Sequence, residues 1–146
     1  METSVTLPFA DGTYRFWLGL PQWVGLERSR GDTSLLTIEE RLRTSIGANG
    51  EEYVFLGGGG AMLKDVCETI RFGLIGGNSA MINGEEREVG PIRAQQLVEE
   101  YVCPARPLEE GVLIAWRILH AAIYTVQLKK KVAGSPESES PPAKAR

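Results

Sequence analysis

The sequence has few of the residues that hold metals or form covalent cross-links. It contains two cysteines, Cys67 and Cys103, and one histidine, His120, in 146 residues. Neither cysteine has a second Cys or His at the spacing of a metal site, and two cysteines do not make the framework of a small disulfide-stabilised domain. We therefore expect two reduced thiols that pack as small apolar side chains. No metal and no cofactor is predicted.

Long apolar segments and an excess of positive charge are also absent. No apolar run approaches the roughly 20 residues that cross a bilayer, and the first residues, METSVTLPF, lack the charged and apolar regions of a secretory signal. The net charge is −3 and the pI about 5.3, so no global field attracts phosphate backbones. The sequence therefore predicts a soluble cytoplasmic protein that does not contact a membrane, and the overall charge disfavours nucleic acid as a partner without excluding a local basic patch.

One glycine-rich segment has only part of the pattern of a phosphate-binding loop. Four glycines run from Gly57 to Gly60, and glycines ahead of a helix can offer backbone N–H groups to an anion. A phosphate loop places Lys and then Ser or Thr directly after its final glycine. Here three residues separate Gly60 from Lys64, which is followed by Asp65. We interpret the segment as a hinge.

No group of residues has the arrangement that catalysis requires. The neighbouring pairs Glu99–Glu100 and Glu109–Glu110 point to different faces of a helix, so neither pair can converge on one substrate as an acid and a base. His120 lies within a predicted helix among leucine and alanine, which favours a structural histidine. Without a nucleophile, a base and an orienting group, the sequence predicts a protein that is not an enzyme.

The apolar pattern predicts an α+β fold that is mostly α, with an N-terminal β-hairpin packed on a bundle of about four α-helices. In residues 4–20, apolar and polar side chains alternate on both sides of a turn at Ala10-Asp11-Gly12. Pro8 is expected on the outer edge, because proline cannot donate to a strand ladder. The spacing of apolar residues and helix-end signals predicts helices over about 33–46, 61–75, 91–102 and 107–131.

The connecting segments are less clearly patterned. Residues 22–30 can form a short helix or a turn, and residues 48–60 contain one short apolar run that suits a strand pairing with the N-terminal hairpin. Asn83-Gly84 indicates either a small hairpin or a loop. Residues 1–132 are expected to form a single domain. Residues 133–146 contain no large apolar residue, so a disordered tail is predicted.

The last predicted helix is apolar around most of its circumference. Two stripes of apolar side chains run along it, made of Val112, Ala115, Trp116, Leu119, Ile123 and Val126 on one side and of Ile114, Ile118, Ala121 and Leu128 on the other. A helix of this kind must be covered on both sides. Two interpretations remain open, a central core helix and a helix that presents one stripe to a partner.

Three separate phrases, in sequence order, resemble one family. They are FADGTYRFWLGLPQ at 9–22, DVCETIRFGLIGG at 65–77 and YVCPARPLEE at 101–110. Together they resemble the small tail proteins of gene transfer agents and related long-tailed phages, which are placed among tail assembly chaperones and are sometimes labelled tail tube proteins. The resemblance covers roughly residues 7–123. The segments at 51–60 and 78–91 look longer than is usual in the family.

The resemblance implies a protein of virion morphogenesis, encoded by a phage, a prophage or a gene transfer agent. Such a chaperone binds the tape measure protein in the bacterial host cell and keeps it soluble until tail tube subunits polymerise. A helical groove lined by apolar side chains would shield amphipathic helices of this client. We expect Trp116 to be the anchor, because aromatic residues dominate interface energetics. The predicted partner-binding residues are Trp17, Leu20, Trp116, Leu119, Ile123, Ile114 and Ile118.

Two other functions remain open. A virion-associated structural subunit of the tail tube or tail terminus, acting as a homo-oligomer, would add the edge of its hairpin to a neighbour's strands. A small regulatory or nucleic-acid-binding module would use Lys129, Lys130 and Lys131. The negative end of the last helix already accounts for these lysines.

Overall fold

A computed structural model describes residues 2–102 and 105–125 of the chain. Within these ranges the chain has the predicted α+β class, with a four-stranded antiparallel sheet, a separate hairpin and five helices rather than about four. The helices are α1 (Leu20–Ser29), α2 (Leu35–Arg43), α3 (Leu63–Gly77), α4 (Pro91–Tyr101) and α5 (Leu108–Tyr124). The strands are β1 (Val5–Phe9), β2 (Gly12–Phe16), β3 (Ile46–Asn49), β4 (Glu52–Phe55), β5 (Ser79–Ile82) and β6 (Glu85–Arg87).

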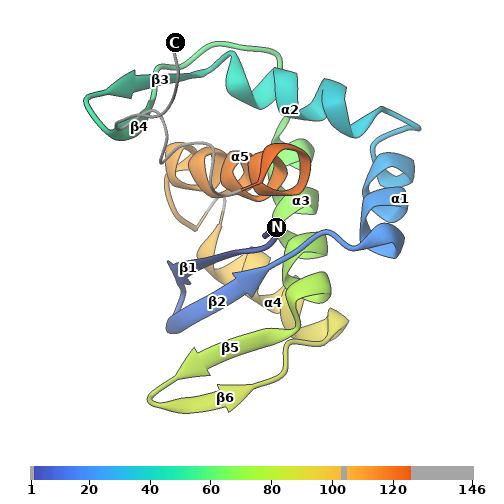
Figure 1. Ribbon diagram of the computed structural model, residues 1–146, viewed down its shortest axis with the longest axis vertical. Helices are drawn as coiled ribbons and strands as arrows, with labels where there is room; N and C mark the ends of the chain where they lie inside the picture. Colours follow the sequence, from blue (N-terminus) through green and yellow to red (C-terminus); the bar gives the residue numbers. More distant parts are fainter. Residues whose placement is uncertain (1, 103–104, 126–146) are drawn as a thin grey trace, which may run out of the picture.

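The larger sheet has the strand order β1-β2-β5-β6, and β3 pairs only with β4. Figure 1 shows α5 between the β3–β4 hairpin and this sheet, with α3 crossing behind α5 and α1 standing at one side of the molecule. The N-terminal hairpin is therefore one half of a larger sheet. Because β5 pairs with the free side of β2, only β1 keeps an open edge in the N-terminal hairpin. Pro8 lies in this outer strand, as predicted.

The N-terminal hairpin follows the predicted alternation. Phe9 pairs with Gly12, so the turn consists of Ala10 and Asp11. Leu7 and Tyr14 are buried on the side of the sheet that faces the helices, while Thr6 and Thr13 are exposed on the other side. The strands end earlier than the predicted range of 4–20, because the chain turns into α1 at Leu20.

The other two hairpins were predicted incompletely. Asn83 and Gly84 form the β5–β6 turn with φ of 52° and 80°, positive values at both positions as the Asn-Gly hairpin signal requires. The strand expected within 48–60 is β4, but it pairs with β3 and not with the N-terminal hairpin. β3 begins at Ile46, in a segment predicted as helix, because α2 already ends at Arg43.

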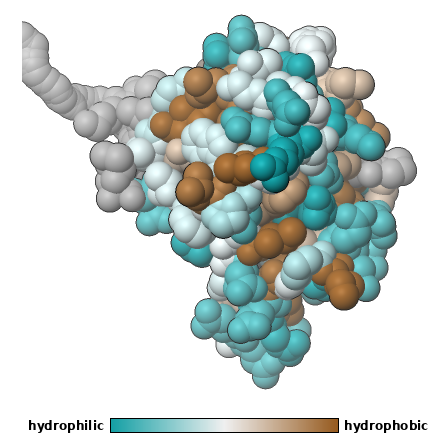
Figure 2. Space-filling view, turned by 90° about the vertical axis from the view of Figure 1, so that its right-hand side faces the viewer, coloured by the Kyte–Doolittle hydropathy of each residue, from teal (hydrophilic) through white to brown (hydrophobic). Residues whose placement is uncertain are grey.

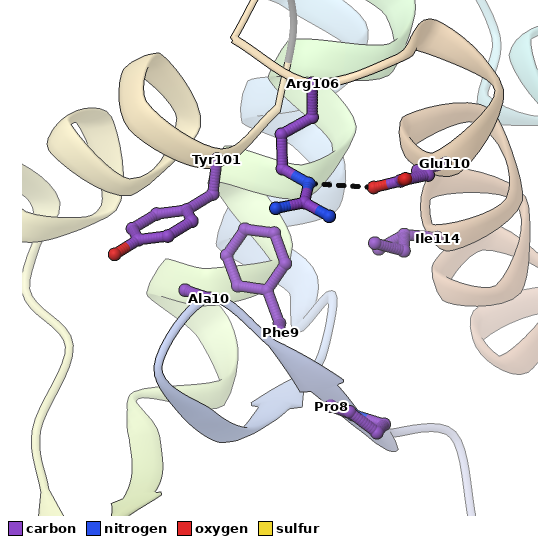
Figure 3. Close-up of a pocket in the computed structure, with 7 residues that line it drawn as sticks. All are labelled: Pro8, Phe9, Ala10, Tyr101, Arg106, Glu110 and Ile114. Atoms are coloured by element: carbon purple, nitrogen blue, oxygen red, sulfur yellow. Dashed lines mark hydrogen bonds and ion pairs between the residues drawn. The ribbon is translucent and has the colours of Figure 1, made fainter.

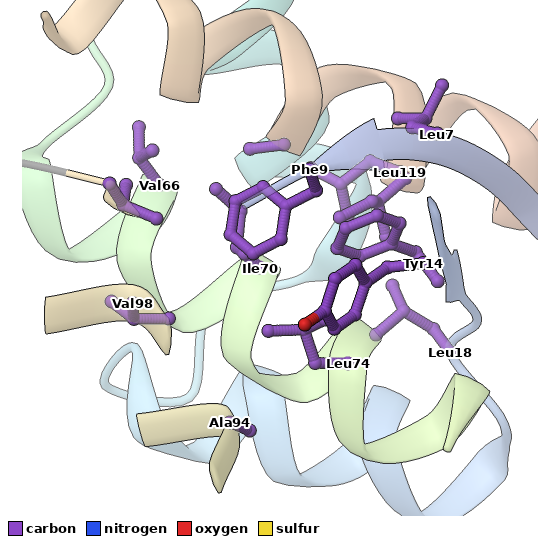
Figure 4. Close-up of a cluster of buried hydrophobic side chains, with 14 of the residues drawn as sticks. Leu7, Phe9, Tyr14, Leu18, Val66, Ile70, Leu74, Ala94, Val98 and Leu119 are labelled. Atoms are coloured by element: carbon purple, nitrogen blue, oxygen red, sulfur yellow. The ribbon is translucent and has the colours of Figure 1, made fainter. Parts of the chain in front are cut away.

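The core lies between the sheet and α3, α4 and α5. Figure 4 shows the buried side chains converging from these elements, with Phe9 of β1 and Tyr14 of β2 facing Ile70 and Leu74 of α3. α3 is central, because it packs against β2, α1, α4 and α5. Full burial of a large apolar side chain contributes roughly 1.5–3 kcal/mol, so this shared core holds the elements together.

The C-terminal end of α3 packs directly on the backbone of β2. The carbonyl oxygens of Arg15 and Trp17 occupy the space that a Cβ would need at Gly77 and Gly76, respectively. Arg15 Nη1 also donates a hydrogen bond to the carbonyl oxygen of Gly77 at 3.2 Å. The sequence suggested that these glycines stop the helix at 75. Instead the helix includes them, and Asn78, with φ of 47°, is its left-handed C-cap.

The remaining predicted helices are present with shifted ends. Helix 91–102 is α4, which ends at Tyr101. The predicted helix 107–131 is α5, which ends earlier than predicted, at Tyr124, because Thr125 leaves the helical conformation with φ of 75°. The segment after Pro21, predicted as a short helix or a turn, is the helix α1. Cys103, the three lysines at 129–131 and the predicted tail at 133–146 lie outside the described residues.

Tyr14 makes the stability of the fold sensitive to pH in the alkaline range. Its hydroxyl donates to Asp11 Oδ1 at 2.6 Å. Burial, and then the adjacent Asp11 carboxylate, raise the pKa of Tyr14 from its usual 10 to about 12. Because the folded state holds the proton more tightly, this contribution to stability is complete below pH 10 and is lost as the pH rises through about 12.

We expect the free energy of unfolding to fall less between pH 10 and pH 12 in Tyr14→Phe than in the wild type, because phenylalanine has no proton to lose. Urea unfolding followed by circular dichroism at several pH values measures this. The same fall in both proteins would contradict the assignment.

Candidate partner-binding surface

α5 is a core helix, so the prediction that it presents an exposed strip anchored by Trp116 is wrong. Trp116 is 5% exposed, and Leu119 and Ile118 are fully buried. Trp116 Nε1 donates to Glu39 Oε2 of α2 at 3.1 Å. Of the two interpretations left open by the apolar pattern, the core helix is the one that the structure has.

The aromatic side chains along α5 form a row. The rings of Trp116 and His120 lie 4.8 Å apart, and those of His120 and Tyr124 lie 5.0 Å apart. Tyr53 of β4 packs on the Trp116 ring at 4.8 Å. We call Trp116, His120 and Tyr124 the aromatic row. Tyr124 is 41% exposed, so the row is covered at the Trp116 end and open at the Tyr124 end.

Two other predicted residues of α5, Ile114 and Ile123, are half-buried at the margin of the core. Ile114 lines a hollow of about 250 Å³ between the tip of the N-terminal hairpin, the end of α4 and the start of α5. Figure 3 shows the ring of Phe9 in this hollow, with Tyr101 on one side and Ile114 on the other.

Two half-exposed charged side chains stand over this hollow. Arg106 Nε donates to Glu110 Oε1 at 2.9 Å, four residues further along the chain (Figure 3). The ion pair is exposed to solvent on both sides, so it contributes at most about 1 kcal/mol to stability. The other lining residues are Pro8, Phe9, Ala10, Tyr101 and Ile114.

Trp17 lies just after β2 and is half-buried. Its Nε1 donates to Thr3 Oγ1 at 3.0 Å, and the Arg15 guanidinium lies 5.4 Å from the centre of its ring. Its backbone N–H donates to the carbonyl oxygen of Gly73 at 3.0 Å. The backbone of Trp17 therefore joins the end of β2 to α3, while its half-buried ring contacts Thr3 and Arg15.

Leu20 is the predicted residue that is most exposed. It is 77% exposed at the start of α1, and Val24, one helical turn later on the same face, is 39% exposed. We call Leu20 and Val24 the α1 face. Figure 2 looks onto the side of the molecule where α1 lies, and hydrophobic patches there alternate with polar surface. Val24 was not predicted, although its spacing of four residues from Leu20 could have indicated it.

The α1 face continues into a shallow hollow of about 380 Å³. The hollow is lined by Val24, Glu27, Arg28, Asp32, Thr33 and Ser34. Glu27 ties its two sides together, because its carboxylate accepts from Trp23 Nε1 at 3.1 Å and from the Leu35 N–H at 2.8 Å. The surface therefore combines an apolar strip on α1 with a polar hollow at its end.

A buried carboxylate fixes the inner end of α1. Asp65 is fully buried in the first turn of α3 and accepts from Arg30 Nε at 2.8 Å, from the Met62 N–H at 2.8 Å and from Arg41 Nη1 at 3.4 Å. The positive end of α3, which follows the glycine run, thus holds an anion from its own chain. This arrangement agrees with our interpretation that the glycine run is not a phosphate loop.

Other classes of site have no support in the described part of the chain. No three His, Cys, Asp or Glu side chains of residues 2–102 and 105–125 gather as metal ligands would. No helix in these ranges has the length and hydropathy needed to cross a membrane. No family model, no curated protein and no solved structure matches the sequence or the fold. The surfaces described above are therefore the basis for a functional proposal.

Proposed function

We propose that the protein is a tail assembly chaperone of a phage, a prophage or a gene transfer agent. It binds the tape measure protein and keeps it soluble until tail tube subunits polymerise around it. The family resemblance of the three sequence phrases suggests the client. The observation that carries the proposal is the α1 face, where Leu20 and Val24 are exposed side by side on a helix whose opposite side is firmly held.

α1 suits the capture of an amphipathic client helix. Its inner residue Leu26 is fully buried, and its last turn is tied to α3 because Arg30, the C-cap residue, pairs with Asp65. A client helix can therefore lay its apolar side against Leu20 and Val24 without any reordering of α1. Two exposed apolar side chains make a small contact, which gives a weak complex that tube subunits can displace.

The alternative of a structural subunit has less support. Strand addition through the N-terminal hairpin needs a free edge, and β5 already pairs with β2. The remaining edge, β1, contains Pro8, and proline is a device that protects edge strands from pairing. The alternative of a nucleic-acid-binding module depends on lysines 129–131, which lie outside the described residues.

A chaperone and a structural subunit differ in what they bind in cells and in whether they are present in mature particles. We expect the tagged, full-length protein to co-purify with the tape measure protein from cells that lack the tail tube subunit. We also expect mass spectrometry to find none of it in purified mature particles, since a chaperone leaves when the tube forms. A copy number in particles similar to that of the tube subunit would contradict the proposal and support the structural role.

A further inference from the structure

Trp23 adds an aromatic ring to the side of α1 that carries the α1 face. It is three residues after Leu20 and directly before Val24, and residues with these spacings share one side of a helix. Its ring is half-buried and packs against the margin of the core. The part of the ring that stays accessible therefore lies beside the two exposed apolar side chains.

Glu27 fixes the orientation of this ring. Trp23 Nε1 donates to Glu27 Oε2 at 3.1 Å, and the same oxygen accepts from the N–H of Leu35 at 2.8 Å. Leu35 is the first residue of α2, so the carboxylate is held from a second helix. Packing against the core and this hydrogen bond together leave the indole little freedom before a partner binds.

A ring held in this way has the properties of a binding anchor. Tryptophan is among the residues that contribute most to protein interfaces when they are truncated. A side chain that is already ordered gives up less conformational entropy on binding than a mobile one. Leu20 and Val24 have no comparable polar contact to fix them, so Trp23 is the part of this surface that is best prepared for a partner.

The charges next to the ring indicate which partner fits. The hollow at the end of the α1 face is lined by two carboxylates, of Glu27 and Asp32, and by one guanidinium, of Arg28. None of the ion pairs between described residues includes any of these three. Arg28 offsets one carboxylate, so the lining keeps a negative charge that favours a basic side chain.

We infer that Trp23 is the anchor of the client contact, that Glu27 is the positioning residue for its ring, and that the client helix carries a basic residue beside its apolar stripe. This inference rests on the proposed function, because the occupant that we assign is an amphipathic helix of the tape measure protein. From Leu20 to Glu27 the surface extends about 10 Å along α1, which matches about two turns of such a helix.

Fluorine NMR of the full-length protein, labelled with 5-fluorotryptophan, tests the anchor. The chain has three tryptophans, and the variants Trp17→Phe and Trp23→Phe assign their signals. Overlapping synthetic segments of the tape measure protein from the same element are the probes. We expect the Trp23 signal to shift when the recognised segment binds and the signal of Trp116, which is 5% exposed, to stay in place. A Trp23 signal that does not move on binding would overturn the inference.

Calorimetric titration of the variants with the recognised segment measures the size of the effect. Trp23→Ala should weaken binding by about 30-fold or more, and Trp23→Phe, which keeps an apolar ring, by less. Tyr53→Ala is the matched control, because it removes another half-buried ring, and Figure 1 shows β4 on the other side of the molecule from α1. It should bind as the wild type. Equal affinities of Trp23→Ala and Tyr53→Ala would contradict the anchor, and if Trp23→Ala does not fold, Trp23→Phe and the fluorine signal decide.

Two further substitutions separate the positioning of the ring from the charge. At high salt, where charges are screened, Glu27→Ala should weaken binding by about three- to tenfold. Glu27→Gln keeps an acceptor for the indole N–H and should then bind as the wild type. Equal affinities of these two variants would show that Glu27 does not position the ring.

Asp32→Asn removes one carboxylate at a residue with φ of 57°, a conformation that asparagine tolerates. It should weaken binding about two- to threefold at low salt and have no effect at high salt. An unchanged affinity at low salt would overturn the basic residue of the client. If no segment binds the wild type, the proposed function fails together with the anchor. If a segment binds and the Trp23 variants bind as the wild type, the anchor alone fails.

Discussion

Gly77→Ala is expected to leave almost no folded protein. The new Cβ would overlap the carbonyl oxygen of Arg15 and lie within 2.5 Å of its carbonyl carbon. Both obstacles are backbone, so α3 and β2 have to separate. Separation stretches the hydrogen bonds from Arg15 Nη1 to Gly77 and from the Trp17 N–H to Gly73. Overpacking costs about 1–3 kcal/mol where neighbouring side chains can move aside. A clash with backbone atoms costs more, and this cost approaches the total stability of a small domain.

Two further variants make this prediction specific. Gly76→Ala should have a similar effect, because its Cβ would overlap the carbonyl oxygen of Trp17. Gly60→Ala is the control, since the nearest atom to its Cβ position, Arg41 Cγ, lies 3.9 Å away. We expect that control to stay within about 0.5 kcal/mol of the wild type. Soluble yield and urea unfolding measure all three, and a Gly77→Ala protein as stable as Gly60→Ala would refute the α3–β2 contact.

Asp65→Ala is expected to lower the free energy of unfolding by about 3–5 kcal/mol, because it removes one partner of a buried ion pair. Asp65 is fully buried, and the side chain of Arg30 is 11% exposed. Without the carboxylate, Arg30 keeps a charge with little access to water, and the Met62 N–H loses its acceptor. The substitution thus loosens the junction of α1 and α3, on which the α1 face depends.

Arg41, the second arginine beside Asp65, allows a more exposed ion pair to be compared with the buried one. Arg41 lies 3.4 Å from Asp65 and is 32% exposed, so Arg41→Ala should cost about 1 kcal/mol or less. Asp65→Asn keeps an acceptor for the Met62 N–H and loses the charge, so its effect should fall between the other two. Denaturant unfolding of the three variants gives the order directly. Equal small losses for Asp65→Ala and Arg41→Ala would show that the buried pair with Arg30 is not a main source of stability.

Local sequence patterns predicted the strands, turns and helices that are determined by residues close together in the sequence. The alternation around the turn at Ala10 and Asp11 places the first two strands. The Asn83-Gly84 signal marks the β5–β6 turn, although it left a loop open as the alternative to a hairpin. The apolar spacing also places α3 and α4 to within two residues at each end. These elements follow from backbone geometry and from the burial of one face.

Contacts between distant segments were not predictable in the same way. Gly76 and Gly77 were interpreted as the end of a helix. In the structure the backbone at the end of β2, about 60 residues earlier in the chain, packs against them and leaves no room for a side chain. The same limit applies to Trp116, since an apolar stripe looks the same whether it faces α2 and Tyr53 or a partner. Leu20 was predicted to bind a partner and is exposed, although partner binding at this position stays a prediction.

The measurement that tests the central claim most directly is the amount of soluble tape measure protein when it is produced together with this protein. We expect the wild type to keep the client soluble, and Leu20→Asp combined with Val24→Asp to reduce the soluble client several-fold, because charge on the α1 face repels its apolar stripe. Ile92→Asp makes the same change at a residue of α4 that is 78% exposed, and it should have no effect. If folded forms of all three keep equal amounts soluble, or if the wild type keeps none, the account is contradicted.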